Sequence, residues 1–280
     1  MPKYCDLHVH SHYSDGTCSP AELIQLAEAA ELDAIALTDH NTLEGLPEFL
    51  AAGENSSVKA IAGIEFSTEY QGTELHILGL FIQPKDYDQI NQLLDTYQRR
   101  KEASNLALAK ALNDAGYFID YEAVKARTNG IPNRALFAAE LIDKGYLSSI
   151  REGCLTILSP KNGLYVPPAR PDAFETIAFI KSMGAVAVMA HPFLNLKEPE
   201  LRVFLKKAVA FGLDGMETVY STFDEELTSR AKNLAAEFRL KESGGSDFHG
   251  GNKPDISIGT GRGNLKIPVE FLHSLASGLD

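Results

Sequence analysis

The first residues of the chain carry closely spaced side chains that could bind a metal ion. The segment D-L-H-V-H places Asp6, His8 and His10 on one face of a strand, because strand side chains alternate between faces. Two neighbouring imidazoles on a buried face need a partner, and a metal ion is the usual one. The turn that follows presents a further carboxylate, Asp15. Taken alone, this pattern would fit a solvent-exposed edge strand better than a metal site.

Further residues of the same chemical kind lie at or near the ends of apolar runs, each typical of a buried strand. They are His40 after residues 34–37, Glu65 after 58–64, His76 within 73–81, His191 after 185–190, and Asp247 with His249 after 240–246. Of the eight histidines, only His12 and His273 lie outside the set, and Glu217 ends another run. In parallel α/β barrels, functional groups at the carboxyl ends of the strands converge on one mouth. The recurrence therefore predicts a shared metal site.

The number of donors indicates more than one ion, because a single ion cannot use nine nitrogen and oxygen ligands. The set is His8, His10, Asp15, His40, Glu65, His76, His191, Asp247 and His249. It predicts two or three divalent ions, with Glu65 and Asp247 as candidate bridges. Ions about 3.5–4 Å apart can activate water and hold the oxygens of a phosphate during in-line displacement. So much imidazole favours Mn, Fe(II) or Zn over Mg.

Amphipathic helices alternate with these runs and would position them. The pattern predicts helices over residues 20–31, 43–52, 173–183, 200–211 and 224–238. The first begins with Ser19 as a candidate N-cap and Pro20 at the first helical position. The alternation predicts an α/β barrel domain over residues 1–84 and 172–280.

The middle segment, residues 85–171, breaks this alternation. Helices are expected over residues 89–115, 121–128 and 134–144, followed by a loop rich in Gly and Pro. We expect an all-helical insertion domain between two barrel strands, and such insertions commonly form lids over a barrel mouth. A purely structural decoration is the alternative.

Composition narrows the function classes. The net charge of −12 argues against binding duplex nucleic acid, which needs a basic face. It allows a small phosphorylated substrate, because bound cations can reverse the local field. The three cysteines show no metal or disulfide spacing, which favours a reducing compartment. Neither a membrane-spanning run nor a signal peptide is evident, so the cytoplasm is the expected location, and the oligomeric state stays open.

Taken together, the motifs resemble the PHP family (polymerase and histidinol phosphatase) in order and kind. They are D-L-H-V-H-S-H-Y-S-D-G, T-D-H, G-I-E, E-L-H-I-L-G, A-H-P and G-S-D-F-H, and they cover the barrel segments. The resemblance implies a distorted (β/α)7 TIM-like barrel with a three-metal phosphoesterase centre. It implies that His8, His10, Glu65 and Asp247 hold the first ion, Glu65, His76 and His191 the second, and Asp15, His40 and His249 the third.

The helical insertion and the ending S-D-F-H are most similar to the stand-alone branch of this family that includes nucleoside 3′,5′-bisphosphate phosphatases, whose members also trim RNA 5′ ends. This resemblance implies hydrolysis of the 3′-phosphate of a nucleoside 3′,5′-bisphosphate, a small nucleotide substrate. A histidinol-phosphate phosphatase would have the same metal site and is one alternative. A binding module with a degenerate site is another, and the complete donor set argues against it.

Fewer residues predict how substrate is held. Arg134, in I-P-N-R-A-L-F-A, is similar to the lid arginine that helps grip phosphate in that branch, and an arginine at the start of a surface helix is the alternative. We predict that Arg134 acts in catalysis with Asp15, His40, Asp247 and His249. Tyr13, Ser14 and Tyr220 are predicted to contact substrate together with Arg134.

The chain departs from the branch at positions expected around substrate. Ala135 and Leu136 replace a frequent Pro or Thr followed by His, Phe193 follows A-H-P in place of a basic or Gly-rich run, and Phe223 stands where relatives often have His. The stretch of residues 255–263 is expected to be a solvated loop, and a rim loop is the alternative, in which Lys253 or Arg262 would contact a second phosphate.

Overall fold

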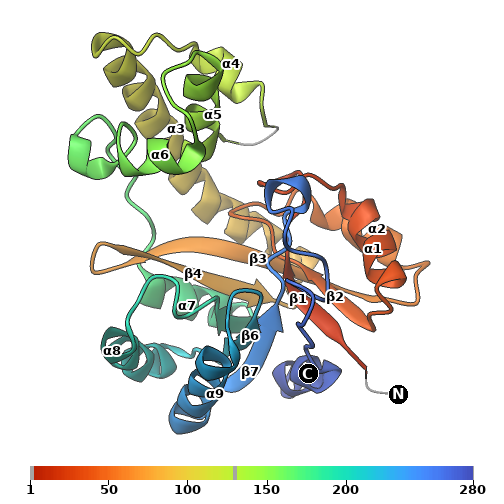
Figure 1. Ribbon diagram of the computed structural model, residues 1–280. Helices are drawn as coiled ribbons and strands as arrows, with labels where there is room; N and C mark the ends of the chain where they lie inside the picture. Colours follow the sequence, from red (N-terminus) through yellow and green to blue (C-terminus); the bar gives the residue numbers. More distant parts are fainter. Residues whose placement is uncertain (1–2, 129–130, 280) are drawn as a thin grey trace. The chain divides into compact units, whose positions relative to one another are not determined.

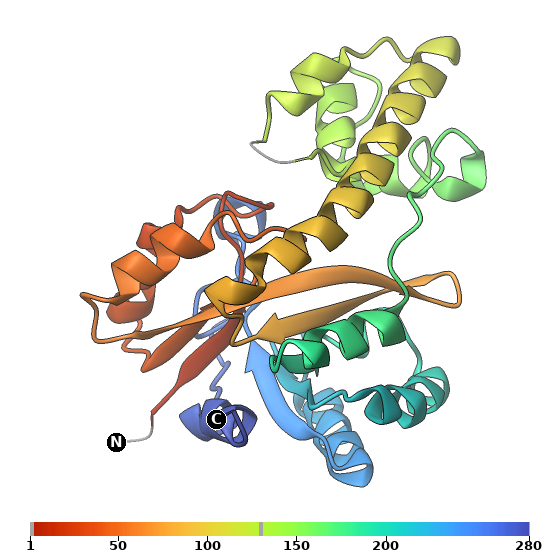
Figure 2. The ribbon, with the colours of Figure 1, turned by 180° about the vertical axis from the view of Figure 1, so that it is seen from behind.

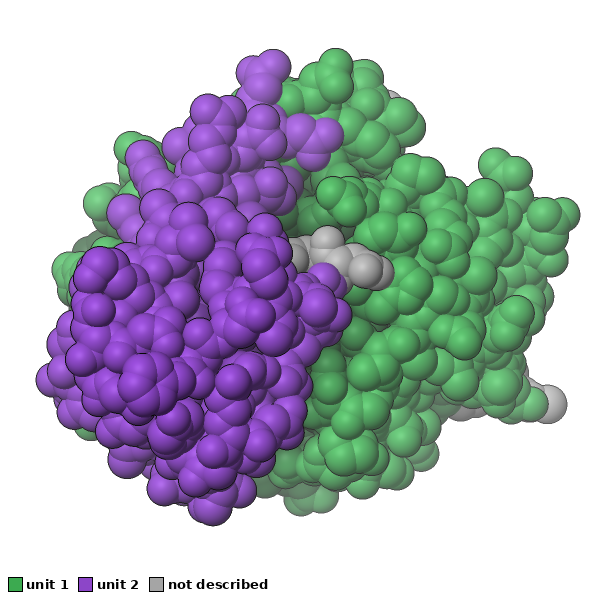
Figure 3. Space-filling model, turned by 90° about the horizontal axis from the view of Figure 1, so that it is seen from above, with its two compact units in different colours: residues 1–90, 171–280 green, residues 91–170 purple. Residues whose placement is uncertain are grey.

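The chain forms two compact units in a computed structural model that describes residues 3–128 and 131–279. One unit contains residues 1–90 and 171–280, and the other contains residues 91–170; Figure 3 colours them separately. Each unit has a hydrophobic core of its own.

The first unit is built on a sheet that follows the order of the chain (Figure 1). Its strands are β1 (Cys5–Val9), β2 (Ala34–Leu37), β3 (Lys59–Tyr70), β4 (Thr73–Leu80), β5 (Val186–Met189), β6 (Gly215–Tyr220) and β7 (Lys241–Gly245). Each strand pairs with the next one along the chain, giving seven strands in sequential order. The pairs are parallel except β3–β4 and β4–β5, which are antiparallel.

The segment that follows β7 returns to β1 and nearly closes the sheet. The Asp247 N–H donates to the His8 carbonyl, and the His10 N–H donates to the Phe248 carbonyl, both at 2.9 Å. At the other end of β1, the Cys5 N–H donates to the Ile267 carbonyl at 2.9 Å. The result is a nearly closed, mixed barrel, which confirms the predicted distorted seven-stranded α/β barrel.

The two antiparallel pairs correct the expectation of a run of parallel strands that end at the metal residues. Strands β3 and β4 form a hairpin whose turn residues Gln71 and Gly72 both have positive φ, 51° and 78°. Such a turn matches the twist of an antiparallel pair. Glu65 therefore lies in the middle of a 12-residue strand, and His76, opposite Ser67, lies in the first half of the returning strand.

Helices cover the strands of this unit. They are α1 (Pro20–Ala29), α2 (Leu46–Gly53), α7 (Ala173–Ser182), α8 (Glu198–Ala208), α9 (Glu225–Phe238) and α10 (Val269–Ala276). Helix α1 begins with the predicted cap, since the Ser19 hydroxyl accepts from the Glu22 N–H and the Glu22 carboxylate accepts from the Ser19 N–H. Helices α1 and α2 pack on each other beside β2 and β3, and the reverse view shows α7 against the β3–β4 hairpin (Figure 2).

Among the helices of this unit, α2 and α10 differ most from expectation. Helix α2 begins at Leu46 rather than at residue 43, because Pro47 has no N–H to donate and fits only the first turn of a helix. Helix α10 was not predicted from the sequence; it packs on β1 and β7 and buries Leu272 and Leu275.

The second unit is helical in its described residues. It contains most of α3 (Tyr87–Asp114), followed by α4 (Tyr121–Lys125), α5 (Arg134–Asp143) and the short α6 (Ile150–Leu155), which was not predicted. Leu108, Leu112, Phe137 and Leu141 are fully buried in its core. The Arg127 guanidinium joins Glu140 and Asp143 at 2.7 Å each. The unit therefore has its own packed core and ion pairs.

Within residues 3–128 and 131–279, no helix combines the length and the apolar character needed to cross a bilayer.

Gly245 allows β7 to approach β1, and its replacement tests this packing. An ideal Cβ at Gly245 would lie 2.1 Å from the His8 Cβ and 2.9 Å from the His8 nitrogen. We expect Gly245→Ala to lower the free energy of unfolding by about 1–3 kcal/mol, as overpacking does, measured by urea denaturation. Gly251→Ala is the control, since its Cβ would meet Thr17 at an ordinary 3.7 Å. Equal stabilities of the two variants would contradict the close contact.

Candidate metal centre

The barrel unit brings all nine predicted ligands into one connected cluster. Its overlapping groups are His10, Asp15, His40 and His249; His8, Glu65 and His191; His8, His10 and Asp247; and His40, Glu65 and His76. Within each group the candidate ligand atoms lie within 4.8 Å of one another. The residues come from β1, β3 and β4 and from the segments that follow β1, β2, β5 and β7.

Two of the candidate ligands adopt backbone conformations that a non-glycine residue rarely takes. His191 has φ of 30° and Asp247 has φ of 56°, and both follow the end of a strand, β5 and β7. Such conformations persist only where the surroundings enforce them, and they cluster at functional sites. The local folding therefore turns both side chains into the cluster at a cost in backbone strain.

Glu65 lies at the centre of the cluster and divides its two oxygens between two sets of imidazoles. Its Oε2 lies 3.2 Å from His8 Nε2, 3.3 Å from His10 Nε2 and 3.0 Å from His40 Nδ1. Its Oε1 lies 2.9 Å from His76 Nδ1 and 3.1 Å from His191 Nε2. A carboxylate with this arrangement can bridge two cations, one on each oxygen.

Asp247 and Asp15 supply the other carboxylates of the cluster. Asp247 Oδ1 lies 3.2 Å from His10 Nε2 and 3.6 Å from His8 Nε2. Asp15 Oδ1 lies 3.1 Å from His249 Nε2 and 3.9 Å from His40 Nε2. These contacts bring the residues of each predicted ion position close together, and His40 Nδ1, 3.0 Å from Glu65 Oε2, also joins two of the positions. The partition into three ions stays a prediction.

Several buried polar atoms of the cluster have no hydrogen-bond partner among the described residues. They are His8 Nε2, both ring nitrogens of His10, His40 Nδ1 and Glu65 Oε2. Burying such groups without a partner is unfavourable, and native structures rarely leave them unsatisfied. All of them are atoms that could ligate a cation, so the donor set fits bound metal ions.

The local electrostatics keep the central carboxylates ionised. Burial alone would raise the pKa of Glu65, but the surrounding imidazoles, with His40 and His8 foremost, hold it well below its usual value. Burial would also raise the pKa of Asp247, and the charges of His8 and His10 lower it instead. The cluster thus presents anionic oxygens to any cation that enters.

The imidazoles divide into two kinds. Burial alone would lower the pKa of His10, but the carboxylates of Asp247 and Glu65, 3.2 and 3.3 Å from its Nε2, raise it to about 9. Burial would also lower the pKa of His76, but the charge of Glu65 and the hydrogen bonds with Glu65 and Glu74 together raise it to about 10. At His40 burial dominates and lowers the pKa to about 3. His10 and His76 therefore hold protons that a metal ion must displace.

A second layer of carboxylates lies behind the candidate ligands. Glu217, fully buried on β6, has Oε1 2.9 Å from His8 Nδ1, while its Oε2 accepts from the His191 N–H at 2.6 Å. Such a carboxylate–histidine pair fixes the ring and leaves Nε2 free to ligate. In the sequence Glu217 ends an apolar run, but no role was predicted for it.

Asp39 and Asp6 hold the loops around the cluster. Asp39 accepts hydrogen bonds from the Ser11 N–H at 2.7 Å and from the hydroxyls of Ser11 and Ser14 at 2.6 Å, which fixes the loop that carries Asp15. Asp6 accepts from the backbone N–H groups of Ser246 and Gly259. The signal for Asp39 was its place beside His40 in the T-D-H motif, whereas Asp6 points inward from β1 as the alternation indicated.

The residues predicted to contact substrate lie in different surroundings. The Tyr220 hydroxyl, which is buried, donates to Asp247 Oδ2 at 2.6 Å. Ser14 donates to Asp39, and the Tyr13 ring packs beside the His12 ring with centroids 4.7 Å apart. Arg134 lies at the start of α5 with its guanidinium 5.1 Å from the Tyr165 ring centroid. Their contacts with substrate stay predictions.

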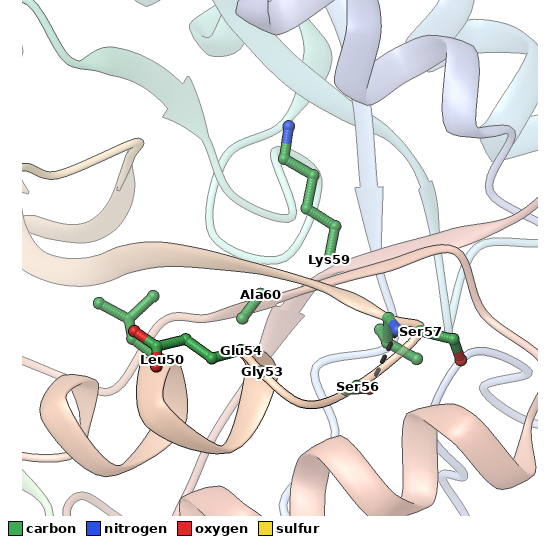
Figure 4. Close-up of a pocket in the computed structure, with 8 residues that line it drawn as sticks. Leu50, Gly53, Glu54, Ser56, Ser57, Lys59 and Ala60 are labelled. Atoms are coloured by element: carbon green, nitrogen blue, oxygen red, sulfur yellow. Dashed lines mark hydrogen bonds between the residues drawn. The ribbon is translucent and has the colours of Figure 1, made fainter.

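A surface hollow between the end of α2 and the start of β3 lies apart from this chemistry. Leu50, Gly53, Glu54 and residues 56–60 line it, and none of them belongs to the cluster (Figure 4). The hydrogen bond drawn there runs from the Val58 N–H to the Ser56 hydroxyl at 3.0 Å. The hollow is therefore separate from the candidate metal centre.

Metal binding is expected to strengthen as the pH rises. In the metal-free protein His10 and His76 hold protons up to pH of about 9 and about 10, so binding between pH 6 and 9 must release them. Each displaced proton makes affinity rise roughly tenfold per pH unit. Calorimetric titration with Mn²⁺ in buffers of different ionisation enthalpy measures both affinity and proton release. A metal affinity that does not change from pH 6 to 9 would contradict the displacement of protons from His10 and His76.

Glu217→Gln tests the support behind His8. The amide has one acceptor oxygen where Glu217 uses two, so either the His8 ring or the His191 N–H loses its acceptor. We expect metal affinity to fall about 10–100-fold. Glu242→Gln is the matched control, since Glu242 accepts from the Thr218 hydroxyl and is partly exposed. Equal metal affinities in both variants would show that Glu217 does not position the ligands.

Comparison with known proteins identifies the family. The model of the PHP domain matches residues 6–162. A 5′-3′ exoribonuclease of Haemophilus influenzae is 32% identical over 89% of this chain and 91% of its own length. A phosphoribosyl 1,2-cyclic phosphate 1,2-diphosphodiesterase of Eggerthella lenta is 30% identical over 90% of this chain and 97% of its own. A 3′,5′-nucleoside bisphosphate phosphatase of Chromobacterium violaceum is 27% identical over 91% of this chain and 90% of its own length.

A solved structure agrees with these relatives. A protein of Bifidobacterium adolescentis, assigned as a metal-dependent phosphoesterase, superposes with a TM-score of 0.84 at 25% identity and covers 99% of this chain and 97% of its own. The likeness extends over both units of the chain. The donor cluster at the mouth of a mixed seven-stranded barrel, the matching domain and the full-length relatives agree: the chain belongs to the PHP-domain family and is a metal-dependent phosphoesterase.

Proposed function

We propose that this enzyme hydrolyses the 3′-phosphate of a nucleoside 3′,5′-bisphosphate, and that the same site trims the 5′ ends of short RNA. Hydrolysis at a metal centre is supported by the surroundings of Glu65, whose two carboxylate oxygens face separate groups of imidazoles. The nucleotide part is supported by relatives with those names that match nine-tenths of the chain, the helical unit included.

The residues would hold two or three ions in the arrangement that their contacts suggest. His8, His10, Asp247 and Glu65 Oε2 would hold one ion, and Glu65 Oε1 with His76 and His191 a second. Asp15, His40 and His249 would hold a third. Mn, Fe(II) and Zn suit this mixture of imidazole and carboxylate better than Mg does. When bound, such ions polarise phosphoryl oxygens and acidify water.

The other residues orient the ligands and the substrate. Glu217 holds the His8 ring, Asp39 holds the loop of Asp15, and Tyr220 holds Asp247. These contacts keep the donor atoms in place before substrate arrives, so little reorganisation is needed during the reaction. We propose that the helical unit acts as a lid and that Arg134 binds phosphate from it, since a guanidinium fork suits phosphate oxygens. A lid suits a mononucleotide better than a long duplex.

The substrate class can be tested by comparing turnover in the presence of Mn²⁺. We expect 3′,5′-bisphosphoadenosine to release its 3′-phosphate and short 5′-phosphorylated RNA to lose 5′ nucleotides. Histidinol phosphate and a ribose 1,2-cyclic phosphate should turn over at least about tenfold more slowly, a difference of about 1.4 kcal/mol in transition-state binding. Efficient turnover of histidinol phosphate without turnover of the bisphosphate would overturn the substrate assignment.

The same assay includes His8→Ala as the test of the hydrolytic centre. The variant removes a fully buried donor that faces both Glu65 and Asp247. We expect a loss of metal and a fall in turnover of about 100-fold or more. His273→Ala, on helix α10, is the matched control outside the cluster. Unchanged turnover in His8→Ala would contradict a metal-dependent reaction at this cluster.

A further inference from the structure

Asp247 uses its two carboxylate oxygens for different tasks. Its Oδ1 faces the imidazoles of His10, at 3.2 Å, and of His249, at 3.4 Å. Its Oδ2 turns away from them and accepts from the Tyr220 hydroxyl and from the Lys253 ammonium, each at 2.6 Å. The ammonium group of Lys253 thus forms an ion pair with Oδ2 of Asp247 and leaves Oδ1, which faces the imidazoles, free to ligate.

The loop that carries Lys253 is fixed in place against the turn of Asp15. The Asn252 side-chain amide donates to the Asp15 carbonyl, and the Gly251 N–H donates to the Thr17 hydroxyl, both at 2.8 Å. The Lys253 N–H donates to the Gly250 carbonyl at 3.1 Å. The backbone under Lys253 is therefore anchored to the same turn that presents a carboxylate to the cluster.

Lys253 also has capacity left for a ligand. An ammonium group has three N–H donors, and Asp247 takes one of them. The side chain is 36% exposed, so its charged end reaches solvent beside the cluster. The other cations of this unit for which ion pairs are known include Lys3, Lys181 and Arg262, and they pair with Asp33, Asp214 and Asp255, outside the cluster.

We propose that Lys253 binds the oxygens of the phosphoryl group that is hydrolysed at this centre. The proposal rests on the proposed phosphoesterase site and adds a substrate-binding residue to it. Lys253 is held by a candidate ligand, so a phosphate that sits against the ligands comes within its reach. Lysine is an established point-charge binder of phosphate. Arg262 is the weaker candidate, because both its Nε and its Nη2 already pair with the Asp255 carboxylate.

Inorganic phosphate is the probe, and the Mn²⁺-loaded full-length protein is titrated with it in a calorimeter. Lys253→Met removes the charge and Lys253→Gln repeats the test with a polar side chain, whereas Lys253→Arg keeps the charge. Lys266→Met is the matched control, since Lys266 is exposed and precedes Ile267, which pairs with Cys5 at the far end of β1 from His8. Metal content and unfolding temperature are measured for every variant.

We expect the dissociation constant for phosphate to rise about 10–100-fold in Lys253→Met and Lys253→Gln, the range for a hydrogen bond to a charged group. Lys253→Arg should recover part of the affinity, and Lys266→Met should stay within about twofold of the wild type, as surface substitutions do. Unchanged phosphate affinity in both neutral variants would overturn the proposal. So would a loss of Mn²⁺ from them, because Lys253 would then support the metal centre instead.

The phosphate titration tests the role of Lys253 separately from the proposed nucleotide substrate. The titration uses no nucleotide, so it reports phosphate binding whichever ester the enzyme hydrolyses. An enzyme that fails to hydrolyse nucleoside bisphosphates but binds phosphate through Lys253 would refute the proposed substrate and leave this inference standing. Efficient bisphosphate hydrolysis by the wild type, with unchanged phosphate binding in Lys253→Met, would refute the role of Lys253 and leave the proposed substrate standing.

Discussion

The buried carboxylate of Glu65 is the interaction on which the centre depends. An ionised carboxylate with almost no solvent contact is expensive to bury, and the cost is offset only by positive charge or hydrogen-bond donors close by. Five imidazoles surround it, three on one oxygen and two on the other. Because these imidazoles come from β1, β4 and the segments after β1, β2 and β5, strands β1 to β5 must come together for the charge to be tolerated. Fold and site are thus coupled at one residue.

The mixed sheet is what allows two groups of imidazoles to share that carboxylate. The tight turn at Gln71 and Gly72 folds β4 back along β3, so His76 comes next to Glu65 from the adjacent strand. The close approach of β7 to β1, made possible by Gly245, then positions Asp247 and His249 beside His10. Small backbone features of this kind determine which donors meet.

Charge in the cluster is arranged in layers. The innermost carboxylates face the imidazoles, and Glu217, Asp39 and Asp6 lie behind them and hold rings and loops. Lys253 donates a hydrogen bond to Oδ2 of Asp247. An acidic protein can therefore offer cationic groups to an anionic substrate at one place, since bound cations and a nearby lysine reverse the local field that the overall charge would suggest.

Much of this protein was predictable from its sequence. Metal-binding residues at or near the ends of successive apolar runs indicate both the barrel and the nine candidate ligands, because the period of a strand and the carboxyl-end rule are local properties of the chain. The pairing of strands and side chains across the sheet was not predicted, because β4 pairs with β5 and Glu217 pairs with His8 although these residues are distant in sequence. The contact of Lys253 with Asp247, six residues apart, depends on how the loop between them folds. Helix α10 was missed as well. Such contacts depend on how twisted strands and loops pack in three dimensions, which no local pattern encodes.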